Sequence, residues 1–242
     1  PGLKNFWAQS RNNFLDISGI LYQISVWIVP ALAAITLHEA AHGFVAWKLG
    51  DDTAKQQGRV TSNPFKHIDP LGTVIIPGLL LLVKAPFLFG YAKPVPVNFA
   101  RLNNPRRDMV WVALAGPGMN FALALLFALC FHLLPLLPQD TALWFADNFK
   151  NGIILNVILG VFNLIPLPPL DGGRVAVGLL PDSLALPLAR LERYGFFILI
   201  GAIFLLPMIT RGLGMELDPI RWLLTVPIGY VVNLIANIAG LV

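Results

Sequence analysis

The chain has 242 residues, of which 56% are hydrophobic and only 12% are charged, and its mean hydropathy is +0.70. Soluble domains carry about 25% charged residues, so this composition excludes a water-soluble globule and a disordered chain. The net charge is +4 and no basic run exceeds Arg106-Arg107, so the sequence predicts a lipid bilayer as its surroundings and no nucleic-acid partner.

Six apolar stretches follow one another along the chain, and each is a candidate for the roughly 20 residues that a spanning helix needs. They cover residues 20–47, 71–89, 109–133, 153–170, 194–210 and 220–242. The second is the weakest span, because Pro77-Gly78 interrupts its middle. No internal repeat or change in composition marks off a soluble domain, so we expect a single membrane-embedded domain over residues 1–242.

The first apolar stretch contains a polar cluster, His38-Glu39-Ala40-Ala41-His42. Histidines four residues apart lie about 40° apart around a helix and about 6 Å apart along it, so both imidazoles can reach one tetrahedral zinc ion. Glu39 can then act as a general base toward a water molecule at the metal. The alternative is two buried histidines and a glutamate paired with a neighbouring helix. However, each ionisable group at membrane depth costs at least about 2.5 kcal/mol, and a divalent metal compensates three of them together.

A third zinc ligand is predicted at Asp171, because zinc hydrolases use three protein ligands and leave the fourth position open. Before it, Pro166, Pro168 and Pro169 prevent a regular helix, and after it Gly172-Gly173 lets the backbone turn sharply. An unwound segment at membrane depth is tolerated only where it lines a protein-buried or wet cavity, and such a segment can hold a carboxylate against a metal. In the alternative, Asp171 simply caps the following segment.

The two halves of this predicted site meet only if their helices run in the same direction. The histidines lie near the carboxyl end of the first stretch and Asp171 lies at the carboxyl end of the fourth, so six full crossings would place them near opposite membrane faces. If residues 71–89 instead enter and leave on one side, the two helices are parallel. This arrangement also puts most Lys and Arg residues on the motif side, which the positive-inside rule assigns to the cytoplasm.

We therefore expect an all-α polytopic membrane protein with five to six transmembrane helices. A membrane-inserted re-entrant or hairpin segment at 71–89 follows the first motif helix, and the amino terminus lies outside.

Three segments, in this order, resemble the site-2 protease family of intramembrane zinc metalloproteases: His38 to His42, Ala115 to Asn120, and Asn163 through Leu170-Asp171-Gly172-Gly173. Residues 58–73 and 90–98 look like the short bacterial-type branch of that family, which lacks an inserted PDZ domain. The resemblance covers most of the chain.

The resemblance implies that Glu39 activates water and that one Zn2+ ion per chain binds three ligands, His38, His42 and Asp171. Asn120 and Asn163 match polar positions near the family's active site, where an amide could orient substrate or stabilise the oxyanion. Hydrogen bonding between packed helices is the alternative role of these two amides.

Two loops carry further candidates. His67 and Asp69 lie in a loop bounded by prolines and could supply another metal ligand, although Asn and Asp beside proline are ordinary turn residues. The stretch from Gly90 to Asn98 alternates apolar residues with proline. It could pair its free backbone groups with an extended substrate strand, or form an irregular loop.

The expected function is zinc-dependent hydrolysis of peptide bonds in or near the transmembrane segments of membrane-protein substrates, with Glu39 as the general base. The expected location is the bacterial cytoplasmic membrane, with the active site toward the cytoplasm. A metal-binding membrane transporter is an alternative, but a transporter would show further polar residues along its spans. A non-catalytic, zinc-stabilised scaffold is another, but it gives Glu39 no role.

Overall fold

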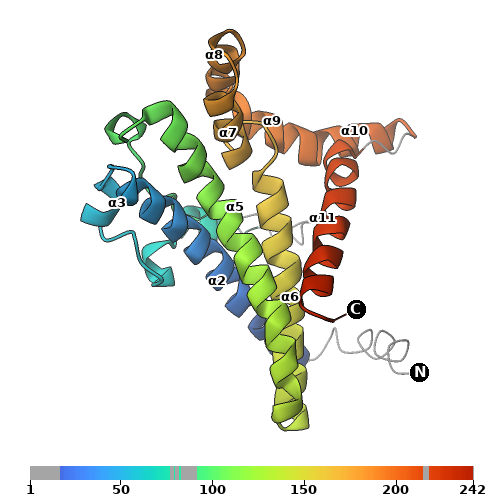
Figure 1. Ribbon diagram of the computed structural model, residues 1–242. Helices are drawn as coiled ribbons and strands as arrows, with labels where there is room; N and C mark the ends of the chain where they lie inside the picture. Colours follow the sequence, from blue (N-terminus) through green and yellow to red (C-terminus); the bar gives the residue numbers. More distant parts are fainter. Residues whose placement is uncertain (1–16, 77–78, 80–81, 83–91, 215–217, 242) are drawn as a thin grey trace.

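A bundle of three long helices forms the centre of the computed structural model, which describes residues 17–76, 79, 82, 92–214 and 218–241. These helices are α2 (Ile17–Lys48), α5 (Pro105–Cys130) and α6 (Gln139–Asn163), and they lie side by side (Figure 1). No β-strand occurs within the described ranges.

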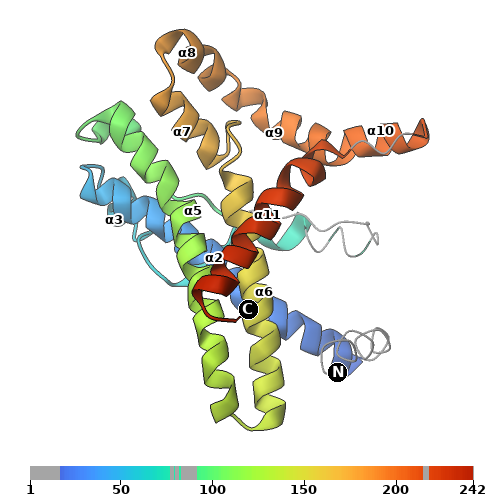
Figure 2. The ribbon, with the colours of Figure 1, turned by 45° about the vertical axis from the view of Figure 1, so that its right-hand side comes forward.

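Shorter helices connect and flank the bundle. Between α2 and α5 lie α3 (Thr53–Gln56), η1 (Pro64–Lys66), η2 (Pro70–Ile75) and η3 (Phe99–Arg101). The chain then continues through η4 (Phe131–Leu136), which joins α5 to α6, and through α7 (Asp171–Leu179), α8 (Asp182–Arg190), α9 (Glu192–Ile200), η5 (Gly201–Leu205), α10 (Leu206–Gly212) and α11 (Pro219–Ile238). Helices α9 and α10 run outward from the bundle, and α11 returns to pack against α6 (Figure 2).

Four helical stretches of the described chain are long and apolar enough to cross a membrane, and they are Ser18–Lys48, Pro105–Leu136, Glu192–Thr210 and Arg221–Ile238. The chain is therefore an all-α polytopic membrane protein, as the sequence predicts. Each of the four stretches overlaps one of the predicted apolar stretches.

The helix expected at 153–170 has different limits in the structure. It is α6, which begins at Gln139 and ends at Asn163. Its first half is too polar to be recognised as part of a span, but some of the polar side chains there have partners on α2. The Tyr22 hydroxyl donates to Asp147 Oδ2 at 2.7 Å, and Trp144 Nε1 donates to Ser25 Oγ at 2.9 Å.

Helices α2 and α6 run in the same direction, and α5 runs against both. The Tyr22–Asp147 bond joins the first halves of α2 and α6. Leu49, just after α2, accepts from the backbone N–H of Asn103, just before α5, at 2.8 Å. The chain thus leaves α2 and enters α5 at the same end of the bundle, as a hairpin at 71–89 requires. The proposed turn of that hairpin, Pro77-Gly78, lies outside the described residues.

The start of the connection between α2 and α5 is fixed by Asp51, whose side chain is fully buried. The backbone N–H of Asn98 donates to Asp51 Oδ2 at 2.6 Å, and Thr53 donates to Oδ1 through both its N–H and its hydroxyl. Burial alone raises the pKa of Asp51, but these hydrogen bonds outweigh it and hold the pKa below its usual value. Asp51 therefore ties segment 92–98 to the end of α2.

Replacing Asp51 by Asn is expected to lower the free energy of unfolding by about 1–3 kcal/mol at neutral pH, because an amide NH2 must then face a backbone or hydroxyl donor. The folded-state pKa is depressed, so the stability from the carboxylate is present above about pH 4 and is lost as the pH falls through the folded pKa. The difference between the two proteins should therefore shrink in acid. Thermal unfolding in detergent across this pH range measures it.

The neighbouring Asp52, which makes a surface ion pair with Arg101, provides the control. An Asp52→Asn protein should stay within about 1 kcal/mol of the parent. An Asp51→Asn protein as stable as the Asp52→Asn protein at pH 7 would contradict the role given to Asp51.

Candidate metal centre

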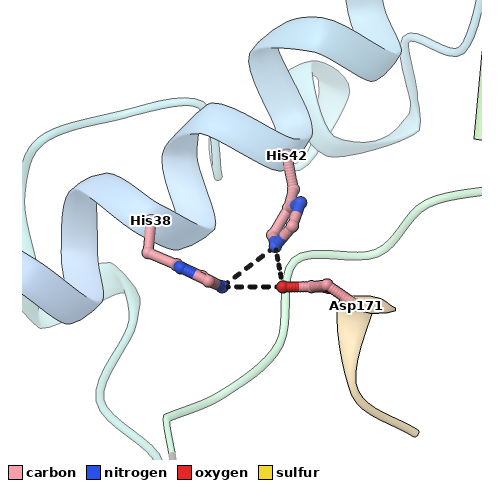
Figure 3. A group of neighbouring side chains, drawn as sticks. All are labelled: His38, His42 and Asp171. Carbon is pink, nitrogen blue, oxygen red and sulfur yellow. Dashed lines mark hydrogen bonds and ion pairs between the residues drawn. The ribbon is translucent and has the colours of Figure 1, made fainter. Parts of the chain in front are cut away.

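Three side chains from two distant parts of the chain converge beside α2. His38 and His42 lie one turn apart on α2, and Asp171 is the first residue of α7. Figure 3 shows the two imidazoles and the carboxylate pointing at one another. The two Nε2 atoms are 3.0 Å apart, and Asp171 Oδ2 lies 3.2 Å from that of His38 and 3.3 Å from that of His42. All three residues are buried.

The turn between α6 and α7 brings Asp171 to the histidines. Residues 164–170 leave the helical conformation, as their prolines predict. Gly172 and Gly173 then pack directly on the backbone of this turn, since a Cβ on either would overlap main-chain atoms of Leu164 or Pro168. The N-cap position of α7 is Leu170 and Asp171 follows it inside the helix, so Asp171 is not the cap residue.

Both histidines are held through the ring nitrogen that faces away from the cluster. His38 Nδ1 lies 2.6 Å from Asn120 Oδ1, and His42 Nδ1 lies 2.7 Å from the backbone carbonyl of Val112. Each partner is an acceptor, so each Nδ1 carries the proton and each Nε2 of the neutral ring presents a lone pair. Such outer partners are what metal-binding histidines usually have.

The donor set fits a zinc ion. Three lone pairs, two from nitrogen and one from carboxylate oxygen, point at one another, and Asp171 Oδ2 is buried without a hydrogen-bond partner. Ligands at the usual distances from a tetrahedral zinc ion are about 3.4 Å apart, close to the separations of 3.0–3.3 Å found here. Among the described residues, this is the one group of three or more His, Cys, Asp or Glu side chains placed to hold a metal.

Space beside the cluster depends on Gly116 of α5. A Cβ at this position would lie 2.6 Å from His38 Nε2 and would also collide with His42 Nε2. Such a contact is far shorter than real Cβ contacts, so only glycine leaves both imidazoles in place. Gly116 belongs to the second segment of the family resemblance, but the sequence alone does not show this reason for a glycine.

Glu39 lies between the two histidines on α2, outside the three-residue cluster. Its Oε2 accepts from the backbone N–H of Val95 at 2.8 Å. Val95 belongs to the extended segment 92–98, which is anchored by Arg59 Nη2 donating to the Lys93 carbonyl at 2.7 Å. A segment that the sequence places more than fifty residues away therefore holds the predicted general base.

His67 and Asp69 make turn contacts and are not part of the cluster. Asp69 Oδ1 accepts from the N–H groups of Leu71 and Gly72 at the start of η2. His67 Nε2 lies 3.1 Å from the Thr61 carbonyl, and burial holds the pKa of His67 below its usual value. In this structure both residues stabilise turns, which is the alternative role that the sequence offered for them.

The two predicted amides have different surroundings. Asn120 is fully buried behind His38, where it also donates to Asn156 Oδ1 at 2.8 Å and thereby joins α5 to α6. Asn163 donates to the Leu159 carbonyl of its own helix at 3.0 Å. Asn156 itself is a residue that the sequence reasoning missed, although a polar side chain in an apolar stretch was the available signal.

Comparison with known proteins identifies the family. Residues 139–207 match the model of peptidase family M50. The chain is 38% identical over 196 residues to "Putative zinc metalloprotease YwhC" of Bacillus subtilis, covering 76% of this chain and 86% of that protein. The chain belongs to peptidase family M50, the site-2 protease family. This confirms the resemblance carried by the three motifs.

Other relatives of the M50 protein are more distant. It is 30% identical over 187 residues to "Putative zinc metalloprotease Rip2" of Mycolicibacterium smegmatis, covering 74% of this chain and 66% of that protein. It is 29% identical over 160 residues to "Putative zinc metalloprotease MJ0611" of Methanocaldococcus jannaschii, covering 64% and 72%. No solved structure matches the chain. The M50 protein is thus a metalloprotease with Zn2+ as its cofactor.

Changing Gly116 to Ala is expected to weaken zinc binding by about 10-fold or more. This is the size of effect seen when the orientation of a metal-binding histidine is disturbed. The added methyl group would push the two imidazoles apart. Competition with a chromophoric chelator, on the purified protein in detergent, measures the affinity. Gly118→Ala is the matched control, because a Cβ at this position of the same helix meets nothing within 4 Å. Equal affinities of the two variants would contradict this account.

Proposed function

We propose that this M50 protein is an intramembrane metalloprotease that hydrolyses peptide bonds in or near the transmembrane segments of membrane-protein substrates. The observation that carries the proposal is the convergence of His38, His42 and Asp171 inside a bundle of apolar helices, with Glu39 beside the two histidines. His38 lies ten residues, or about 15 Å of helix, before the end of α2 at Lys48. That position lies well within the thickness of a bilayer.

In this proposal the ligands are His38, His42 and Asp171, and their Nε2 and carboxylate lone pairs hold one Zn2+ ion. When bound, zinc supplies a Lewis acid for the scissile carbonyl and makes a water molecule more acidic. Glu39 takes a proton from the attacking water as the new C–O bond forms. It returns that proton to the nitrogen of the peptide as the C–N bond breaks.

The backbone N–H of Val95 donates to one oxygen of Glu39. This bond directs the carboxylate, because a charge-assisted hydrogen bond fixes the position of one of its two oxygens. Segment 92–98 therefore has a positioning role toward Glu39.

The structure supports a substrate-binding role for Asn120 or Asn163 less directly. The Asn120 amide is already occupied by His38 and Asn156, so an oxyanion contact would require it to leave these partners. Asn163 is only partly buried, and it is the more accessible of the two amides.

We further propose that the protein lies in the bacterial cytoplasmic membrane with its active site toward the cytoplasm. The proposal rests on the basic residues, which concentrate at the end of the bundle where α2 ends and α5 begins. Lys48, Arg101, Arg106 and Arg107 all lie there.

Replacing Glu39 by Gln is expected to lower the rate of cleavage by about 10²–10⁴-fold, because the amide cannot accept the proton of water. Zinc content should be unchanged, since Glu39 is not a ligand in this proposal. Cleavage of a single-span substrate, reconstituted with the enzyme in vesicles, measures the rate. A Glu39→Gln protein that cleaves as fast as the parent would show that Glu39 is not the general base. A zinc-loaded parent that cleaves no substrate would instead favour a transporter or a scaffold.

A substrate with a weakened helix is expected to be cleaved faster, because a carbonyl bonded inside a helix must be released before attack. One Leu→Gly change near the cleaved bond lowers the cost of unwinding by about 0.8 kcal/mol, which corresponds to a rate increase of about four-fold. The same change two helical turns away is the control. If both substrates are cleaved equally fast, local unwinding does not limit the reaction.

A further inference from the structure

The two histidines of the cluster are fixed by partners of different kinds. His42 Nδ1 faces the main-chain carbonyl of Val112 at 2.7 Å, and a carbonyl can only accept. His38 Nδ1 faces the side-chain amide of Asn120 at 2.6 Å. An amide presents an acceptor at one end and a donor at the other, so the tautomer of His38 depends on which end of Asn120 points toward it.

The orientation of the Asn120 amide is fixed by the groups around its nitrogen. Asn120 Nδ2 donates to Asn156 Oδ1 at 2.8 Å and to the Ala34 carbonyl at 3.3 Å. Asn156 is itself oriented, because its Nδ2 donates to the Gly152 carbonyl at 2.8 Å within α6. The oxygen of Asn156 must therefore face Asn120, and the oxygen of Asn120 must face His38.

Both amides are fully buried, with exposed fractions of 0%. An unpaired polar group would be costly in such surroundings, so each amide is strongly held in the orientation that pairs all its groups. If the Asn120 amide turned over, its NH2 would face His38 Nδ1. The ring proton would then move to Nε2, the atom that points at Asp171.

We propose that Asn156 is a positioning residue for metal binding. Through Asn120 it selects the tautomer of His38 that carries its proton on Nδ1, which leaves the Nε2 lone pair free to bind zinc. This inference rests on the ligand set of the proposed function, and it adds a residue of α6 that touches neither the metal nor the substrate. His42 needs no such residue, since Val112 holds it through the main chain.

A purely structural role for Asn156, in which it only joins α6 to its neighbours, predicts a different pattern of effects. Asn151 provides the matched comparison because it is a buried asparagine on the same helix. It also bonds across the bundle, donating to the Val26 carbonyl of α2 at 3.1 Å. It has no link to either histidine, so its loss tests the effect of an inter-helix hydrogen bond alone.

The first experiment measures zinc affinity of the full chain in detergent by competition with a chromophoric chelator. Removing the outer partner of a metal-binding histidine usually weakens binding 10- to 100-fold, so we expect about 10-fold for Asn156→Leu and at least as much for Asn120→Leu. Asn156→Asp in its neutral acid form can accept from Asn120 through one oxygen and donate to the Gly152 carbonyl through the other, so this variant should recover most of the affinity. Asn151→Leu should bind as tightly as the parent.

The second experiment does not depend on zinc affinity, and it begins with the parent sequence. With ¹⁵N-labelled histidine, nuclear magnetic resonance of the metal-free parent, recorded at a pH where both rings are neutral, should show the Nδ1–H tautomer for both His38 and His42. In Asn156→Leu the His38 signal should move toward a mixture of tautomers, whereas the His42 signal should stay unchanged as an internal reference.

The outcomes separate this inference from the proposed function. A parent that binds no zinc would overturn both. A parent that binds zinc, together with an Asn156→Leu protein of equal affinity and an unchanged His38 tautomer, would overturn the role of Asn156 alone. Equal losses in Asn156→Leu and Asn151→Leu would also overturn it, since they would indicate a general effect of helix packing. If Asn156→Leu does not fold, the same two measurements on Asn156→Ala take its place, and a parent in which His38 carries its ring proton on Nε2 would overturn the inference by itself.

Discussion

Two histidine nitrogens and one carboxylate oxygen lie within 3.3 Å of one another among apolar helices, and the rest of this structure depends on bringing them together. The nitrogens are the Nε2 atoms of His38 and His42 on α2, and the oxygen belongs to Asp171 at the start of α7. Their mutual repulsion at close range is relieved by a cation. Helix α6, which leads to Asp171, must therefore run in the same direction as α2, and α5 must pass close enough to α2 that only a glycine fits at position 116.

The polar groups that surround the cluster form chains in which each member has a partner. The series from Gly152 through Asn156 and Asn120 to His38 runs from α6 across α5 to α2. Every bond in it joins a donor to an acceptor. The Gly152 carbonyl at its end can only accept, so it determines which way the amides of Asn156 and Asn120 face. Buried polar groups are costly when unpaired, which makes such a series both rigid and specific.

A second layer of contacts comes from the loops rather than from the helices. Segment 92–98 is held by Asp51 at one end and by Arg59 near the other, and between them Val95 reaches Glu39. The proposed metal ligands are thus positioned by packed helices and the turn before α7, and the proposed base is oriented by a loop.

The amino-acid sequence was enough to predict the class of protein, the proposed ligand pair His38 and His42 with Glu39 between them, and the break in helix before Asp171. These features are local, since they depend on composition, on helical spacing and on proline. Only the tertiary structure decided which distant groups meet. It showed that Asp147 in the first half of α6 accepts a hydrogen bond from Tyr22 of α2. It also showed that Asn120 donates to Asn156 and that the N–H of Val95 donates to Glu39. Such contacts join residues far apart along the chain, and no local pattern encodes which of many polar side chains will become neighbours when the helices pack.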